Sequence, residues 1–239
     1  MAKTSGLDTR IYANGTDLSG DVSALSGVGM SQNLLDVTTL DLSATARLAG
    51  LKDGSVSCSA FFDNAAGKGH SVWTSLSGKI PIADQNVLIP LSATIGEPAL
   101  FLVSKQGTYN VERPSGGPVS CSVDYSAANG TSPDFGELLT GGKVSDSSGT
   151  TYTAVDNGAS SSSGIRAMIQ AFSLTSGSAT CTIQDSADDI TYATLGAFTA
   201  VTGQTSELLS VSGTVERYVR LLTSGTFSTL VVCVAFIRL

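Results

Sequence analysis

The sequence predicts an all-β protein with one short helix, and three observations support this fold class. Turn-forming pairs such as Asn14-Gly15, Asp53-Gly54 and Asn129-Gly130 separate runs rich in Val, Ile, Thr and aromatic residues, as expected where tight turns join strands. Only 14% of the 239 residues are charged, against about a quarter in an average soluble domain, so Ser and Thr must fill many polar strand positions. Residues 70–76, which begin at His70, are the only run with helical character.

Alternation of apolar and polar residues places strands along the whole chain. In the first half we expect strands at 9–12, 31–40, 55–62, 87–94, 100–105, 108–112 and 119–126. In the second half we expect strands at 151–156, 166–174, 179–184, 190–198, 207–211, 217–223 and 230–238. We interpret Gly27-Val28-Gly29 as loop backbone and the Ser-rich stretch 157–164 as a surface loop.

Residues 126–142 are rich in small and turn-forming residues and contain Pro133, which predicts a linker with few contacts across it. We therefore expect two domains, one covering residues 1–129 and a second β-sandwich covering residues 130–239. The second domain has its own candidate core at Met168, Ala171 or Phe172, Cys181, Ile183, Tyr192, Phe198, Val219, Leu221, Val232, Val234 and Phe236. A chain that ends near Asn129 should then still assemble, and the remainder should fold alone.

Two segments are similar to each other, VSCSAFFD at 56–63 and VSCSVDYS at 119–126. Because successive side chains of a strand point to opposite faces, each segment has one apolar and one small polar face. The expected core-facing set is Val56, Cys58, Ala60, Phe62, Val119, Cys121, Val123 and Tyr125. The opposite face carries Ser57, Ser59, Ser120, Ser122 and Asp124. The two segments could lie in one sheet.

Charge and cysteine usage restrict the possible partners. A net charge of -7 argues against a nucleic-acid-binding surface, because such surfaces neutralise phosphates with Lys and Arg. We see no secretion signal, and the longest apolar run, 230–237, is far shorter than the roughly 20 residues of a membrane helix. We therefore expect a protein made in a reducing cytoplasm, with no membrane partner. Its four cysteines, Cys58, Cys121, Cys181 and Cys233, are interpreted as buried free thiols, with disulfides or a metal site as the alternatives.

The motifs of common enzyme classes are missing, so we expect neither catalysis nor a cofactor. His70 is the only histidine and no GxSxG elbow occurs, which leaves no Ser-His triad. A carboxylate pair for glycoside hydrolysis remains compatible with the spacing. Asp185, Asp188 and Asp189 are interpreted as turn residues, with a calcium site as the alternative.

Residues 37–63, VTTLDLSATARLAGLKDGSVSCSAFFD, resemble the tail tube (major tail) proteins of long-tailed bacteriophages. The pattern is a V-T-T-L strand, a small-residue loop with an Arg, then G-L-x-D-G and an alternating strand that ends in an aromatic residue and Asp. The segments GHSVWTSL, VLIPLSATI and VSCSVDYS also fit. The resemblance implies a tail-tube-type β-sandwich or partial barrel with one flanking helix. The second half, from GTTYTAVDNG to VERYVRLLTSGTF, is similar to accessory β-sandwich domains of phage tail proteins.

This resemblance implies a structural virion protein whose copies form hexameric rings, stacked into the tail tube that conducts the genome. Ser57, Ser59, Ser120, Ser122 and Asp124 would then face the lumen, where acidic side chains repel phosphate and small neutral ones offer no cation to bind it. A long loop at 41–51 would contact a neighbouring subunit or ring, with Leu42, Arg47, Leu48 and Leu51 as candidate contact residues.

The implied partners are further copies of the chain, other tail proteins, and passing DNA that is not bound specifically. The implied location is the tail of the virion, after assembly in the host cytoplasm. The alternative function is a tail-tip, decoration or adhesin-like protein whose β-sandwich binds carbohydrate.

Overall fold

The computed structural model describes residues 8–74 and 78–239, and these residues form fourteen strands and one helix. All strand pairs are antiparallel, and the strands join into one open sheet. The expected all-β class is confirmed. The elements are β1 (Tyr12–Ala13), β2 (Thr16–Asp17), β3 (Val22–Asp36), β4 (Arg47–Phe61), α1 (Gly69–Trp73), β5 (Gln85–Pro90), β6 (Pro98–Glu112), β7 (Ser120–Ala127), β8 (Asp134–Leu138), β9 (Val144–Asp146), β10 (Val155–Asp156), β11 (Ile165–Ser186), β12 (Ala193–Ala197), β13 (Thr205–Val211) and β14 (Tyr218–Arg238).

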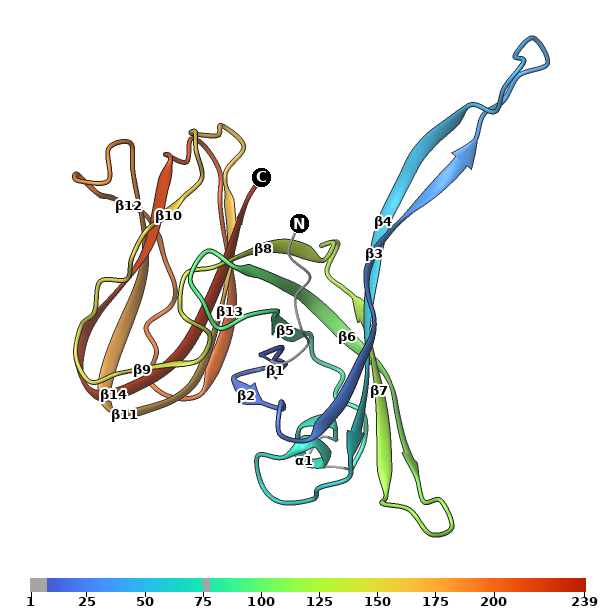
Figure 1. Ribbon diagram of the computed structural model, residues 1–239, viewed down its shortest axis with the longest axis horizontal. Coiled ribbons are helices and arrows are strands. Elements are labelled where there is room, and N and C mark those ends of the chain that lie inside the picture. The colour runs from blue at the N-terminus through green and yellow to red at the C-terminus, as the bar shows by residue number, and fades with distance from the viewer. Residues whose placement is uncertain (1–7, 75–77) are drawn as a thin grey trace.

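In the first half, the strands are ordered β3-β4-β7-β6-β5-β1-β2, and α1 packs beside them (Figure 1). Trp73 of α1 is fully buried, and its Nε1 donates a hydrogen bond to the Tyr125 hydroxyl at 2.8 Å. The helix begins at Gly69, where a Cβ would lie 2.3 Å from the Trp73 ring, so a larger residue would displace that ring. The expected end of the helix, Leu76, lies outside the described residues.

The second half is built on two very long strands. β11 and β14 pair from Ile165 opposite Arg238 to Ser186 opposite Tyr218, and Figure 1 shows the two strands curving together. These two strands replace four expected ones, which were at 166–174, 179–184, 217–223 and 230–238. We call this pair of strands the β11/β14 ribbon. Gly177 and Gly225, with φ of 78° and 120°, lie near its middle. Residues on both sides of these glycines contribute to one core, which includes Ile169, Cys181, Leu221 and Val234.

The expected linker at 126–142 is wrong, because this segment contains β8. β8 pairs with β6 on one side, at Leu100 opposite Phe135, and with β14 on the other, at Ala235 opposite Leu138. A hydrophobic cluster also draws on both halves of the chain. Its buried members are Tyr12, Leu88, Ala99, Phe101, Val103, Leu138, Met168, Cys233 and Ala235. We call these shared contacts the junction.

Polar side chains complete the junction. The fully buried Gln170 of β11 accepts a hydrogen bond from the Gly15 backbone N–H at 2.6 Å and donates one from Nε2 to the Asn86 carbonyl at 2.9 Å. Lys143 forms an ion pair with Asp17 at 2.7 Å. The two halves of the chain are thus held by strand pairing, apolar packing and buried hydrogen bonds together.

Several strand boundaries differ from those expected. β3 starts at Val22 and runs through Gly27-Val28-Gly29, because a register shift between Ser26 and Gly29 absorbs these residues into the ladder instead of a loop. β6 joins two expected strands through another irregularity, between Gln106 and Thr108. The strands β2, β8 and β9 were not expected at all, since each has five residues or fewer and depends on its partner strands.

Candidate assembly surfaces

The two similar segments lie side by side in one sheet, β4 against β7. Ser57 is paired with Asp124, and Ser59 with Ser122, so their side chains share one face. We call the face that carries Ser57, Ser59, Ser120, Ser122 and Asp124 the polar face. Ser59 is exposed and the other four are partly exposed.

Asp124 is the centre of a small hydrogen-bond network on the polar face. Its carboxylate accepts hydrogen bonds from the Ser57 hydroxyl at 2.5 Å and from the Thr108 hydroxyl at 2.7 Å. These hydrogen bonds lower the pKa of the Asp124 carboxyl, because they stabilise its charged form. The polar face therefore presents small hydroxyl side chains around a fixed negative charge.

The opposite face of these strands is the core, with two corrections. Val56, Cys58, Ala60, Cys121, Val123 and Tyr125 are buried, as expected. Phe62 and Val119 are only partly buried, because they lie just outside the ends of β4 and β7, where the sheet stops. Phe62 instead packs against the ring of His70, with centroids 4.9 Å apart.

Tyr192 is a third correction to the expected core. It is only partly buried, and the guanidinium of Arg220 lies 3.4 Å from the centroid of its ring. Met168 is buried as expected, but in the junction cluster, and Phe172 packs there beside it. The remaining expected core positions of the second half are in its main cluster.

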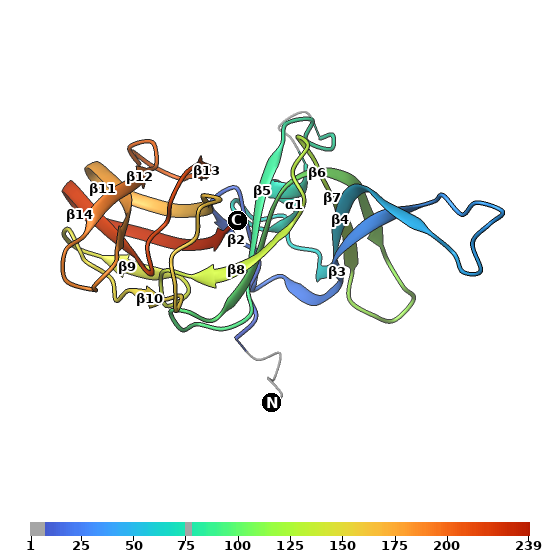
Figure 2. The same cartoon turned by 90° about the horizontal axis from the view of Figure 1, so that it is seen from above.

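The second candidate surface is the end of the β3/β4 hairpin, which extends away from the rest of the molecule (Figures 1 and 2). The expected loop at 41–51 is shorter than predicted, because Arg47, Leu48 and Leu51 belong to β4. We call residues 30–51 the distal hairpin and residues 37–46 its tip. The distal hairpin exposes eight large apolar side chains, Met30, Leu34, Leu35, Val37, Leu40, Leu42, Leu48 and Leu51.

Both faces of the distal hairpin are apolar. Leu35 is paired with Leu48 on one face, while Leu34 is paired with Ala49 on the other. Sequence analysis found Leu42, Leu48 and Leu51 but missed Leu34 and Leu35. Two adjacent leucines in a strand occupy opposite faces, and this was the signal that could have indicated a ribbon covered on both sides.

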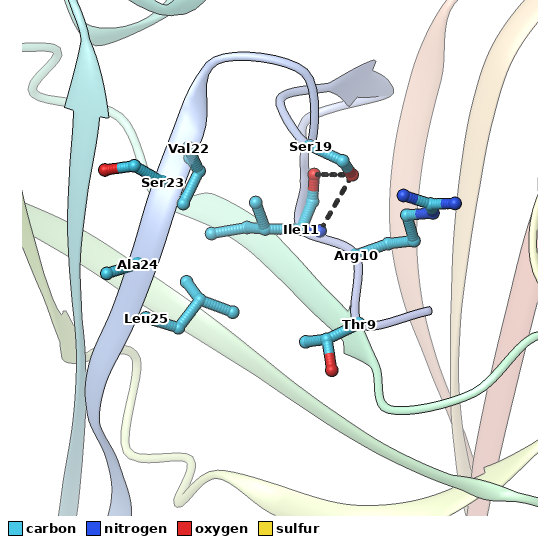
Figure 3. Close-up of a pocket in the computed structure, with 8 residues that line it drawn as sticks. All are labelled: Thr9, Arg10, Ile11, Ser19, Val22, Ser23, Ala24 and Leu25. Carbon is cyan, nitrogen blue, oxygen red and sulfur yellow. Dashed lines mark hydrogen bonds between the residues drawn. The ribbon is translucent and has the colours of Figure 1, made fainter. Parts of the chain in front are cut away.

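The described residues also contain a cavity of about 310 Å³ between residues 9–11 and the start of β3 (Figure 3). Ile11, Val22 and Leu25 line it, and Arg10 points away from β3. The Ser19 hydroxyl accepts a hydrogen bond from the Ile11 N–H at 3.1 Å and donates one to the Ile11 carbonyl. Ser19 therefore braces the local backbone.

The residues considered for other chemistry have structural roles. Cys58, Cys121, Cys181 and Cys233 are buried free thiols, as expected, and burial raises the pKa of Cys58, Cys181 and Cys233 to about 12. Asp188 accepts hydrogen bonds from the N–H groups of Ile190 and Thr191 at 3.0 and 2.9 Å, which is turn chemistry.

Nδ1 of His70 lies 2.8 Å from the Tyr109 hydroxyl. Among the residues that the structure describes, no group of three or more acidic, His or Cys side chains is placed to hold a metal ion. No helix within 8–74 or 78–239 combines the length and apolar character needed to cross a bilayer.

Comparison with known proteins gives structural likenesses only. No protein-family model matches the chain, and no curated protein sequence matches it. A chain from the virion of a native gene transfer agent particle is similar at 17% identity and a TM-score of 0.42, over 56% of this chain and 98% of that one. A chain from the C6-symmetric tail of an empty gene transfer agent particle gives 16% identity and a TM-score of 0.40 over the same shares. The Dit hub protein of phage SPP1 gives 8% identity and a TM-score of 0.38, over 96% of this chain and 99% of Dit.

Proposed function

We propose that this chain is a structural protein of a phage tail, in which copies form hexameric rings that stack into the tail tube. The observation that carries the proposal is the distal hairpin. Large apolar side chains gain about 1.5–3 kcal/mol each on burial, and contiguous apolar patches on a monomer usually mark an interaction site. Eight such side chains on one projecting ribbon are consistent with a segment that neighbouring copies cover.

The polar face suits the wall of a channel for DNA. A wall should not bind phosphate, and the Ser side chains around the ionised Asp124 offer no cation to a passing backbone. We infer that the polar face lines the lumen and that the second half of the chain is displayed outside. In this arrangement the protein resides in the virion, where it meets other tail proteins.

Electron microscopy of the purified protein in negative stain tests the proposal. We expect rings or tubes from the native chain, and predominantly monomers from Leu35→Ser/Leu48→Ser, which removes one apolar pair of the distal hairpin. The control is Ile82→Ser/Ile190→Ser, since both isoleucines are highly exposed outside the hairpin. A native chain that stays monomeric at high concentration, or a hairpin variant that forms normal tubes, would overturn the proposal.

A second candidate function is a tail-tip protein whose C-terminal half binds carbohydrate. It is favoured by a surface cluster on β11 and β14, where Arg220 stacks on Tyr192, just before β12, and donates a hydrogen bond to Gln184 Oε1 at 3.0 Å. Aromatic and polar side chains of this kind can contact a sugar ring. Single closed rings without tubes, together with glycan binding that Tyr192→Ala abolishes, would support this candidate over the first.

A further inference from the structure

An open groove of about 600 Å³ lies where the β3/β4 hairpin leaves the rest of the molecule. Met30 and Lys52 of the hairpin form one wall, Phe135 of β8 forms another, and Ile237 and Arg238 of β14 close it. Met30 and Phe135, in the walls of the groove, are 56% and 41% exposed, and apolar side chains exposed together often mark an interaction site. The groove thus offers apolar surface that a further segment could bury.

The groove is also cationic. It is lined by Lys52, Arg166 and Arg238 but by only one acidic side chain, Asp134, which is paired with Arg166 at 2.6 Å. Arg238 donates to the backbone carbonyls of Asn157 and Ala159, and its charge also acts on the carboxyl of Glu137, which does not line the groove. Lys52 is exposed and forms no ion pair among the described residues. An occupant should therefore combine apolar side chains with negative charge.

The tip of the distal hairpin has this composition. Within residues 37–46 the only charged residue is Asp41, and it is flanked by Leu40 and Leu42. Leu40 is fully exposed and Leu42 is about half exposed. The hydrogen bond from the Thr39 hydroxyl lowers the pKa of the Asp41 carboxyl, so its charge persists at mildly acidic pH.

The tip cannot reach the groove of its own chain. Gln32 and Lys52 are a register pair at the groove, and the strands continue past them to Asp36 and Arg47 before the tip begins. At about 3.3 Å per residue, this paired ribbon carries the tip well beyond the groove, and Figures 1 and 2 show it directed away from the molecule. A hairpin tip that occupies this groove must therefore come from another copy of the chain.

We propose that the groove receives the hairpin tip of a second copy of this chain, with Leu40 and Leu42 on the apolar surface and Asp41 near Lys52. This proposal rests on the proposed function and names the contact that joins two subunits. Tip and groove are different surfaces, so the contact is head-to-tail, and such contacts close into rings when the rotation between copies permits. The acidic tip and the basic groove together fix the direction of the contact.

Charge reversal tests the contact. Asp41→Lys and Lys52→Glu should each raise the protein concentration needed for ring formation by about fivefold or more, since each places like charges together. An equimolar mixture of the two variants should restore assembly, because each tip then meets an oppositely charged groove. The double variant in one chain should assemble alone. The proposed contact is wrong if the native chain forms rings but neither reversal changes the concentration that they need. It is also wrong if the mixture of variants does not recover assembly. In both cases the proposed ring-forming function still stands.

Disulfide trapping gives a second, independent measurement. The native cysteines are buried, so they do not compete with introduced surface thiols. A mixture of Leu40→Cys and Phe135→Cys chains should form a disulfide-linked dimer on mild oxidation. A mixture of Leu40→Cys and Ile82→Cys is the control, because Ile82 is more exposed than Phe135 but lies outside the groove. Equal dimer yields from the two mixtures would count against the groove, whereas an absence of any rings from the native chain would count against the proposed function.

Discussion

Asp134 is an acidic residue whose buried environment disfavours the ionised form of its carboxyl group. Burial raises the pKa of Asp134 to about 6, although the charges of Arg166 and Lys52 act in the opposite direction. The folded chain therefore holds this proton more tightly than the unfolded chain. The resulting stabilisation is complete below about pH 4 and is lost as the pH rises through about 6.

Asp134→Asn should remove this contribution, which is on the order of 3 kcal/mol. We expect the difference in unfolding free energy between native chain and variant to change between about pH 4 and pH 7, as measured by urea unfolding. Asp156→Asn is the contrasting control, because hydrogen bonds from Arg217 lower the pKa of Asp156 to about 2 and its stabilisation is lost only as the pH falls. A difference between native chain and Asp134→Asn that does not vary with pH would contradict the assignment.

Gln170 is the residue on which the junction's buried hydrogen bonds converge. Gln170→Leu keeps much of the side chain's volume but leaves the Gly15 N–H without its buried partner. An unsatisfied buried group costs about 1–3 kcal/mol, so thermal unfolding should shift to lower temperature. Gln204→Leu removes an exposed hydrogen bond to Thr16 at the same junction and should change stability by less than about 0.5 kcal/mol. Equal effects of the two substitutions would show that burial of Gln170 is not what matters.

At the scale of elements, the long β11/β14 ribbon depends on glycine at its centre. Gly177 has a positive φ, and a Cβ there would lie 1.8 Å from the Thr226 carbonyl oxygen. Gly177→Ala therefore combines backbone strain with a clash, and we expect a loss of at least about 1–3 kcal/mol in chemical unfolding. Gly203→Ala is the matched control, because a Cβ at Gly203 meets no atom within 4 Å. A Gly177→Ala chain as stable as the native one would show that the ribbon can bend elsewhere.

The same ribbon shows how much the sequence can predict. Local alternation located the core-facing side of β4 and β7, because a period of two is a property of each strand alone. The pair Ser224-Gly225 has the composition of a turn, but the positive φ of Gly225 occurs inside β14. A glycine in the sequence indicates that the backbone can adopt a positive φ, but not whether strand pairing continues through that position. The neighbouring strands determine whether it does.

Among the candidate surfaces, one could be predicted from local alternation and one could not. The polar face was predictable, since Ser57 and Asp124 follow the alternation of their strands. The groove was not, because Lys52, Phe135 and Arg238 come from three distant elements. The junction also escaped prediction, as β8 consists of five residues with no strong alternation and becomes a strand through pairing on both sides.

For the whole molecule, the junction determines what each half can do alone. Each half has its own hydrophobic cluster, which supports a division into two parts near residue 129. The third cluster belongs to both halves, and a chain ending at Asn129 would expose Leu88, Phe101 and their neighbours, which are fully buried in the complete chain. Such a chain also loses β8 from the edge of β6, and an unpaired edge promotes aggregation.

We therefore expect residues 1–129, expressed alone, to aggregate or to bind a hydrophobic dye strongly. Asn129 and Gly130 form an exposed turn with φ of 58° and 66°, so a break in the chain there disturbs no buried backbone. Co-expression of 1–129 with 130–239 should yield a soluble one-to-one complex, because β8 then pairs with β6 across the break and Gln170 again meets Gly15. Size-exclusion chromatography with light scattering measures both results. If residues 1–129 are instead soluble alone and form rings without the second fragment, the first half is an independent assembly unit. The junction would then only attach the second half to its exterior.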